Sequence, residues 1–260
     1  MSIIFRPTES VINICDLSDL GLEIFLKAIS REIPGQYDVC SESFVIMLQC
    51  VRIFESIIEL ARKDLVCIQS ALILSRSLFE GCVKISWILY PPDMFECESR
   101  YLSYLETEID FLKKLKNVYV NTSEEASKIE SRHTKYMEFR DGVAALLKKK
   151  GHKIPKIPNT REMLKSLGEE RKYLNYMLLC QFTHLSHYAG NTYRQNLGSE
   201  KVFTETAQMD NWNLVFNICW PVFELAAEFY LFRVEQKDTP YNDSFKNIVR
   251  TALLNINPIS

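Results

Sequence analysis

Two short segments of the sequence hold side chains of the kinds that bind anions and transfer protons. Within residues 65–83, Arg76 and Glu80 are the only charged residues. The second segment, 173–193, has no Lys, Arg, Asp or Glu, yet it contains His184. A guanidinium can hold an anion, and an imidazole beside a carboxylate can accept or donate a proton. We therefore predict a catalytic cluster in which Arg76 holds an anion, Glu80 orients His184, and His184 is the acid/base.

The polar residues of the charge-free segment, 173–193, have the spacing of one face of a helix. Steps of three and four residues place five polar side chains on one face of a helix: Tyr176, Cys180, His184, His187 and Asn191. The other face carries an apolar stripe: Leu174, Leu178, Phe182, Leu185 and Ala189. We expect a helix over 169–189 that is buried on both sides. Because buried polar groups need partners, we predict a buried Arg76–Glu80–His184 cluster, held by direct or water-bridged contacts.

The sequence gives less support to two other kinds of site, a cysteine nucleophile and a metal site. Cys180 and His184 could form a thiolate–imidazole pair, but a cysteine among apolar residues is usually inert core. The two histidines of the segment could ligate a metal with Cys180 or Glu80, and Glu130 and His133 have the spacing of di-iron bundles without a second such motif. We predict no metal and no cofactor. The cluster could instead be a structural network that fixes helix packing, and both readings stay open.

The elements that must position these residues are helices. Apolar residues recur at helical spacing along most of the chain, and there are only eight glycines. We predict an all-α bundle of about eight or nine helices with essentially no sheet, and a loop over 190–204. The helices expected are 17–32, 41–62, 64–90, 96–119, 122–150 with Thr122 at its start and Gly151 after its end, a short one capped by Asn159, 169–189, 206–235 with a kink at Pro221, and 243–255.

A single helical domain over 1–260 fits this length and composition. The proline-containing loop 151–159 is the one candidate boundary, and it would join sub-layers 1–150 and 160–260.

The segment "LILSRSLFEGCVKISWIL" resembles the R-x-x-x-E helix of the bacterial helical family called domain of unknown function 5677. "YMLLCQFTH" is similar to the later Y-x-x-L-S-x-x-x-H stretch of that family, and the likeness covers about 41–193. The resemblance implies a helical fold and a polar cluster of Arg76, Glu80, Tyr176 and His184. This chain departs from the pattern at Cys180, where the family has Ser.

A second comparison is with the HEPN helical ribonucleases, whose signature is an Arg followed by four to six residues and then a His. No Arg of this chain has a His at that distance. An Arg–His pair assembled from different helices could still support in-line RNA cleavage.

Charge and cysteine content limit the partner classes. The formal net charge is −2, so there is no general basic field of the kind that marks a nucleic-acid binder. One local basic patch could touch phosphates, although it also reads as a solvated helix end: Lys148, Lys149, Lys150 and Lys153. Eight isolated cysteines favour reduced thiols, and we expect a cytoplasmic protein with no secretory leader and no membrane span.

Aromatic residues in the last long helix suggest association. Residues 212–232 offer more aromatic surface than one helix usually buries in a monomer, so we expect a homodimer. The function that we predict is that of a toxin-like or phage-defence effector, such as a nuclease, acting on nucleic acid or nucleotide. The alternative is a non-catalytic helical module that binds a partner protein.

Overall fold

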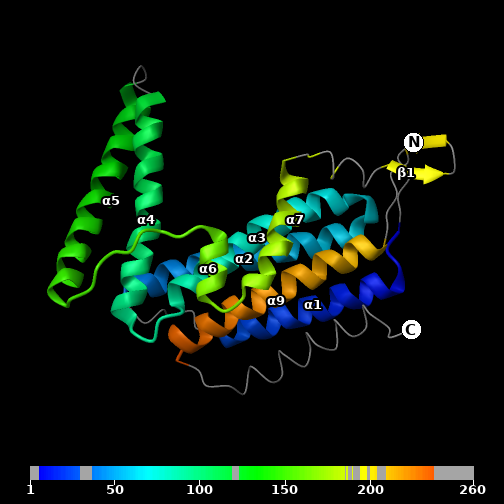
Figure 1. Ribbon diagram of the computed structural model, residues 1–260, viewed down its shortest axis with the longest axis horizontal. Coiled ribbons are helices and arrows are strands. Elements are labelled where there is room, and N and C mark those ends of the chain that lie inside the picture. The colour runs from blue at the N-terminus through cyan, green and yellow to red at the C-terminus, as the bar shows by residue number, and fades with distance from the viewer. Residues whose placement is uncertain are drawn as a thin grey trace.

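The computed structural model describes residues 6–29, 37–118, 123–184, 186, 189, 194–197, 200–203 and 209–236. These described residues form eight α-helices and a two-stranded antiparallel sheet, which confirms an all-α fold with very little sheet. Four long helices lie side by side as the main bundle (Figure 1), namely α1 (Glu9–Ala28), α2 (Asp38–Lys63), α3 (Ile68–Leu89) and α9 (Met209–Arg233). The first helix begins earlier than predicted because Thr8 caps it, accepting the backbone N–H of Val11 at 3.4 Å.

Helix α3 is the centre of the bundle. It follows a single 3-10 turn, Leu65–Cys67, which Asp64 caps by accepting the backbone N–H of Val66. α3 packs against α2 and α9 along its apolar sides and against α7 (Tyr173–Thr183) along its polar side. This central position explains why residues 65–83 contain so few charges, since most of the surface of α3 faces other helices.

The aromatic residues of α9 lie inside the monomer. Each is at most 1% exposed: Trp212, Phe216, Trp220, Phe223 and Tyr230. Phe223 and Tyr230 pack edge-to-face against Phe25 of α1. Phe54 of α2 contacts the rings of Phe216, Trp220 and Phe223. Of the aromatic residues from 212 to 232, only Phe232 is largely exposed, at 53%. The buried rings therefore offer no surface to a second copy of the chain, and dimerisation stays a prediction without their support.

Helices α1 and α9 approach each other closely at one glycine. A Cβ at Gly21 would lie 2.7 Å from a ring carbon of Trp220, a distance that real side chains do not tolerate. The indole N–H of Trp220 donates to Ser18 Oγ at 2.9 Å, so the polar atom of this buried ring is satisfied. Gly21 is thus required by the space that Trp220 occupies.

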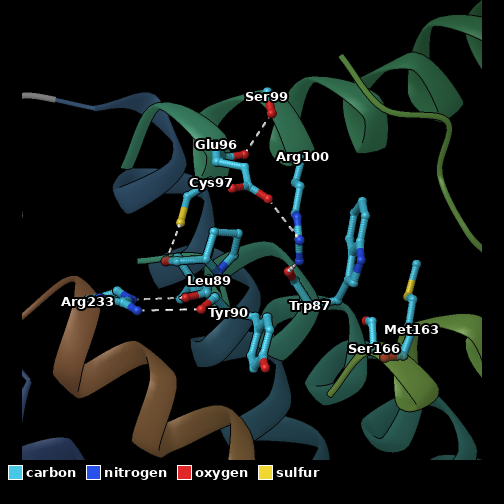
Figure 2. Close-up of polar contacts among 11 residues, drawn as sticks. Trp87, Leu89, Tyr90, Glu96, Cys97, Ser99, Arg100, Met163, Ser166 and Arg233 are labelled. Carbon is cyan, nitrogen blue, oxygen red and sulfur yellow. Dashed lines mark hydrogen bonds and ion pairs between the residues drawn. The ribbon is translucent and has the colours of Figure 1, made fainter. Parts of the chain in front are cut away.

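The C-terminal end of α3 is capped by arginines from two other helices (Figure 2). Arg100 donates to the carbonyl of Trp87 at 2.7 Å, and its guanidinium lies 5.0 Å from the Trp87 ring centre. Arg233 donates to the carbonyls of Leu89 and Tyr90 at 3.2 and 3.4 Å. These side chains satisfy carbonyls that a helix end leaves without partners, and their positive charge suits the negative end of the helix dipole.

Helices α4 (Met94–Val118) and α5 (Ser123–Lys149) form an antiparallel arm that projects from one end of the bundle (Figure 1). α5 ends at Lys149, one residue before the predicted end, and Gly151 follows with φ +85° as the predicted glycine after the helix. The N–H of His152 then donates to the carbonyl of Leu147 at 3.0 Å, the closing bond of a Schellman motif. The predicted start of this helix at Thr122 lies outside the described residues.

The segment after the arm contains α6 (Thr160–Ser166), a 3-10 turn (Glu170–Lys172) and α7. The predicted cap of α6 is confirmed, because Asn159 and Glu162 accept each other's backbone N–H groups. Two further predictions are wrong. The charge-free helix ends at Thr183 rather than 189, and the expected loop contains strands β1 (Arg194–Leu197) and β2 (Glu200–Phe203).

The early end of α7 has a local cause. Ser186 accepts the backbone N–H of Ala189 on its hydroxyl at 3.3 Å, as a helix N-cap does, and a serine that bonds this way competes with a continuous helix. Pro221 lies inside α9, as predicted. The short helix expected over 243–255 lies outside the described residues, and the proposed sub-layers 1–150 and 160–260 stay a prediction.

By length and composition alone, two helical segments are apolar enough to cross a membrane, Leu65–Leu89 and Trp212–Arg233. Both are central helices of the bundle that pack against each other, and core helices commonly pass the same test. They are weak evidence for a membrane span.

Candidate functional site

The polar side of α3 carries an arginine and a glutamate one helical turn apart. Arg76 Nε donates to Glu80 Oε1 at 3.0 Å. Partial burial by itself lowers the pKa of Arg76, but the hydrogen bond and negative charge of Glu80 outweigh this and raise that pKa. The carboxylate therefore fixes the direction in which the guanidinium points.

His184 meets the same guanidinium from the end of α7. Arg76 Nη1 lies 3.2 Å from His184 Nε2, which confirms the predicted contact between the two residues. Because a guanidinium has donors and no acceptor, Nε2 must accept this hydrogen bond. The contact thus selects the neutral imidazole with its proton on Nδ1.

Tyr176 forms the floor beneath the arginine. The Arg76 guanidinium lies 5.7 Å from the centre of the Tyr176 ring, within the range of a cation–π interaction. The ring stacks on Phe79 of α3 with centroids 6.0 Å apart, and the hydroxyl interacts with the side chains of Cys180 and Thr160. Burial, followed by Cys180 and the charge of Glu80, raises the pKa of Tyr176.

We call this set of five residues the polar cluster: Arg76, Glu80, Tyr176, Cys180 and His184. The prediction that the cluster is buried is wrong. The Arg76 and Glu80 side chains are 19% and 39% exposed, and His184 is exposed. The reason is that α7 covers α3 with one side only, through Leu179 and Phe182.

The outer side of α7 faces solvent, although it is apolar. Leu174 of the predicted core stripe is 70% exposed, and Met177 is 48% exposed. The charge-free composition of the segment therefore does not mean that both sides are packed.

The structure also changes one predicted relationship within the polar cluster. Glu80 contacts Arg76, and Arg76 contacts His184, so the glutamate orients the histidine only through the arginine. His187 and Asn191 lie outside the described residues. Sequence reasoning missed Thr160 and Phe79, which hold Tyr176 in place; the helix spacing could not reveal them, because α6 supplies the threonine and Phe79 reads as ordinary core.

The remaining candidate groups do not join the polar cluster. Glu130 pairs with Lys116, and both lie on the arm together with His133. The patch of Lys148, Lys149, Lys150 and Lys153 is exposed at the end of α5 that lies across the molecule from α7 (Figure 1). Within the described part of the chain, no group of three or more His, Cys, Asp or Glu side chains is placed to hold a metal ion.

Comparison with known proteins yields one match. Residues 43–201 match the model of a family of unknown function (DUF5677). This span covers more than half of the chain and includes every member of the polar cluster. No curated protein and no solved structure matches the chain.

Proposed function

This chain belongs to a family of unknown function (DUF5677), and we propose from the geometry of its polar cluster that it binds the phosphate of a nucleotide or nucleic acid and acts on it. The observation that carries the proposal is the 3.2 Å contact between Arg76 and His184 at the surface. An anion-binding group and a proton-transfer group meet there within reach of solvent.

Arg76 is the residue that would hold the phosphate. A guanidinium has more N–H donors than the contacts with Glu80 and His184 use, and its planar shape suits a bidentate bond to phosphate. Glu80 and the Tyr176 ring hold this side chain in one orientation before a ligand arrives. Such preorganisation reduces the entropy lost on binding.

His184 is the residue that would move the proton. A phosphate oxygen that accepts a hydrogen bond from Arg76 Nη1 competes with His184 Nε2 for the same donor. The Nε2 lone pair then becomes available to take the proton of an attacking hydroxyl. In RNA cleavage the ribose 2′-oxygen would form the new bond to phosphorus and give a 2′,3′-cyclic phosphate. The bond from phosphorus to the 5′-oxygen would break, the proton of the 2′-hydroxyl would go to Nε2, and the leaving 5′-oxygen would take a proton from water.

A non-catalytic module that binds a partner protein is the second candidate. The exposed side chains of Leu174 and Met177 favour it, because apolar residues on one outer face commonly mark a docking surface. In that case the polar cluster serves to hold α7 on α3. The first candidate function requires His184 for activity, whereas the second requires it for the stability of the fold.

Three variants compare the candidates. His184→Ala and Arg76→Met remove the two proposed functions, and His133→Ala removes a histidine on the arm as a matched control. We expect the first two to lose cleavage of labelled RNA and toxicity or phage protection in cells, with melting temperatures close to wild type. Arg76→Met should also weaken binding of the RNA in fluorescence anisotropy, whereas His184→Ala should still bind.

The opposite pattern would support the partner-binding candidate. If His184→Ala lowers the melting temperature strongly while Leu174→Ser abolishes the cellular phenotype, the phosphate proposal is wrong. Wild-type protein that neither binds nor cleaves RNA or nucleotides would also contradict it.

A further inference from the structure

A cleft of about 520 Å³ lies at the foot of the arm, between the start of α2 and the facing sides of α4 and α5. Its volume falls in the range of small-molecule sites. Aromatic side chains form much of its wall, with Tyr101 and Tyr104 from α4 and Tyr136 and Phe139 from α5. We call it the arm cleft. It is separate from the polar cluster, since the two share no residue.

The arm cleft has an excess of negative charge. Asp38, Glu42 and Glu108 line it, and its cation, Arg132, pairs with Glu108 at 3.4 Å. Asp38 and Glu42 make no ion pair with any described residue. Burial and the charge of Asp38 raise the pKa of Glu42. The carboxylates of Asp38 and Glu42, in the first turns of α2, are therefore left without a compensating cation.

Tyr101 supplies a polar group of a different kind. This residue lines the arm cleft and is only 5% exposed, yet its hydroxyl makes no hydrogen bond within the described part of the chain. Burial, followed by the negative charges of Glu42, Glu98 and Asp38, raises the pKa of Tyr101. The ring is buried, but the hydroxyl is not among the enclosed polar atoms without a partner, so it opens into the cleft and is available to a ligand.

The aromatic walls already hold cations from the chain itself. Lys84 Nζ lies 4.4 Å from the centre of the Tyr104 ring, and the Arg132 guanidinium lies 5.3 Å from that of Tyr136. Rings in such surroundings attract organic cations through their electron-rich faces. A hydrated metal ion would gain little from these walls, because hard divalent cations prefer oxygen ligands.

We propose that the arm cleft binds an aliphatic diamine or polyamine in its protonated form. Its ammonium groups would pair with Asp38 and Glu42 and donate to the Tyr101 hydroxyl, and its methylene chain would lie against the tyrosine rings. A dication matches the two uncompensated carboxylates. The ligand class follows from charge, aromatic surface and the unpaired hydroxyl together.

Isothermal titration calorimetry with putrescine and spermidine tests this proposal on the full-length protein. 1,4-Butanediol serves as the uncharged analogue, and magnesium chloride as a hard dication. We expect both amines to bind and the diol and magnesium not to bind. Glu42→Gln and Asp38→Asn should each weaken spermidine about tenfold or more, the effect of losing a charge-assisted hydrogen bond. Tyr101→Phe should weaken it by a smaller factor.

Glu23→Gln is the matched control, because it removes one exposed carboxylate on α1 that pairs with Lys27. It should leave spermidine binding unchanged. Equal weakening by Glu23→Gln would show that the amines bind the general surface charge and would overturn the proposal. The absence of binding at millimolar amine, or equal binding of magnesium, would overturn it too. Thermal melts check that each variant is folded.

Discussion

The two sides of α3 differ in how they meet their neighbours. Toward α9 the contact is sealed: Ser75 and Cys219 are fully buried, and the thiol donates to the serine hydroxyl at 3.3 Å. Toward α7 the contact is polar and open, with Arg76 and His184 at the surface. One helix thus has a side that stabilises the fold and a side that is accessible to ligands.

Because of this difference, we expect the residues that stabilise the fold and the residues that could bind a ligand to lie on different sides of α3. Burial of apolar surface supplies most of the free energy of folding, and the α9 helix contributes fully buried residues to it. The α7 side also buries Leu179 and Phe182, but its polar contacts are partly exposed, and such contacts contribute little stability. Changes on the two sides should therefore have opposite consequences for folding and for function.

The largest effect should follow from emptying the sealed core around α9. Trp220→Ala should lower the free energy of unfolding by about 3–5 kcal/mol, because a large cavity forms and Ser18 loses its donor. Urea unfolding followed by circular dichroism measures this change. Phe232→Ala removes an exposed ring of the same helix and should change stability by less than about 0.5 kcal/mol. Similar losses in both variants would contradict the sealed core described above.

The second expected effect is on the pH dependence of stability, and it contrasts the buried Glu98 with the partly exposed Glu80. Glu98 is 4% exposed; it accepts the N–H of Val39 on Oε2 at 3.0 Å, and its Oε1 has no hydrogen-bond partner. Burial raises the pKa of Glu98 from 4.5 to about 7; the Val39 bond opposes this rise, and the charge of Asp38 adds to it.

A raised carboxyl pKa means that the folded state holds the proton more tightly than the unfolded state. The stabilisation is fully present below pH 4.5 and is lost as the pH rises through about 7. Glu98→Gln should remove this decline, which amounts to about 1–3 kcal/mol. Urea midpoints of both proteins across this pH window measure it, with Glu80→Gln as the open control. Parallel curves for wild type and Glu98→Gln would contradict the prediction.

The third effect concerns the capped end of α3. Arg100→Met should lower stability by about 1–3 kcal/mol, because the Trp87 carbonyl loses a charged donor. Arg52→Met is the control, since the side chain of that arginine is exposed and pairs with Glu55 on the same helix. Differential scanning calorimetry compares the two variants. If both lose the same stability, the arginine cap contributes nothing beyond an ordinary surface charge.

The smallest effect on stability should come from the open side. His184→Ala should change the free energy of unfolding by less than about 1 kcal/mol, because an exposed imidazole can be replaced by water as a partner for Arg76. Chemical denaturation measures this. A loss above about 2 kcal/mol would mean that the contact stabilises the packing of α7 and that the open side is structural.

Part of this contrast could be predicted from the sequence. The spacing of Arg76 and Glu80 in an apolar run predicted an ion pair, and the need for a partner predicted the contact with His184; the structure confirms both. Exposure could not be predicted, because it depends on how much of α7 the bundle covers. The end of α7 before Ser186 was missed because residues 173–189 contain no Gly or Pro to mark a break.

Contacts between helices far apart in the sequence could not be predicted for a related reason. Helical spacing shows which residues share a face, but it does not show which faces meet. The aromatic residues of α9 were therefore assigned to a dimer, although α1 and α2 cover them. The arm cleft combines α2, α4 and α5, which are joined only by tertiary packing.

The hydrogen bond between Trp220 and Ser18 spans 202 residues of sequence and joins two helices that flank the family-matched region. During synthesis α1 would leave the ribosome on the order of 10–40 s before its partner on α9. Until then Phe25 of α1 and Phe54 of α2 have no α9 rings to pack against. The nascent chain therefore leaves these apolar rings uncovered by α9 until its last long helix emerges, and a fragment limited to residues 43–201 would leave Phe54 without its α9 partners.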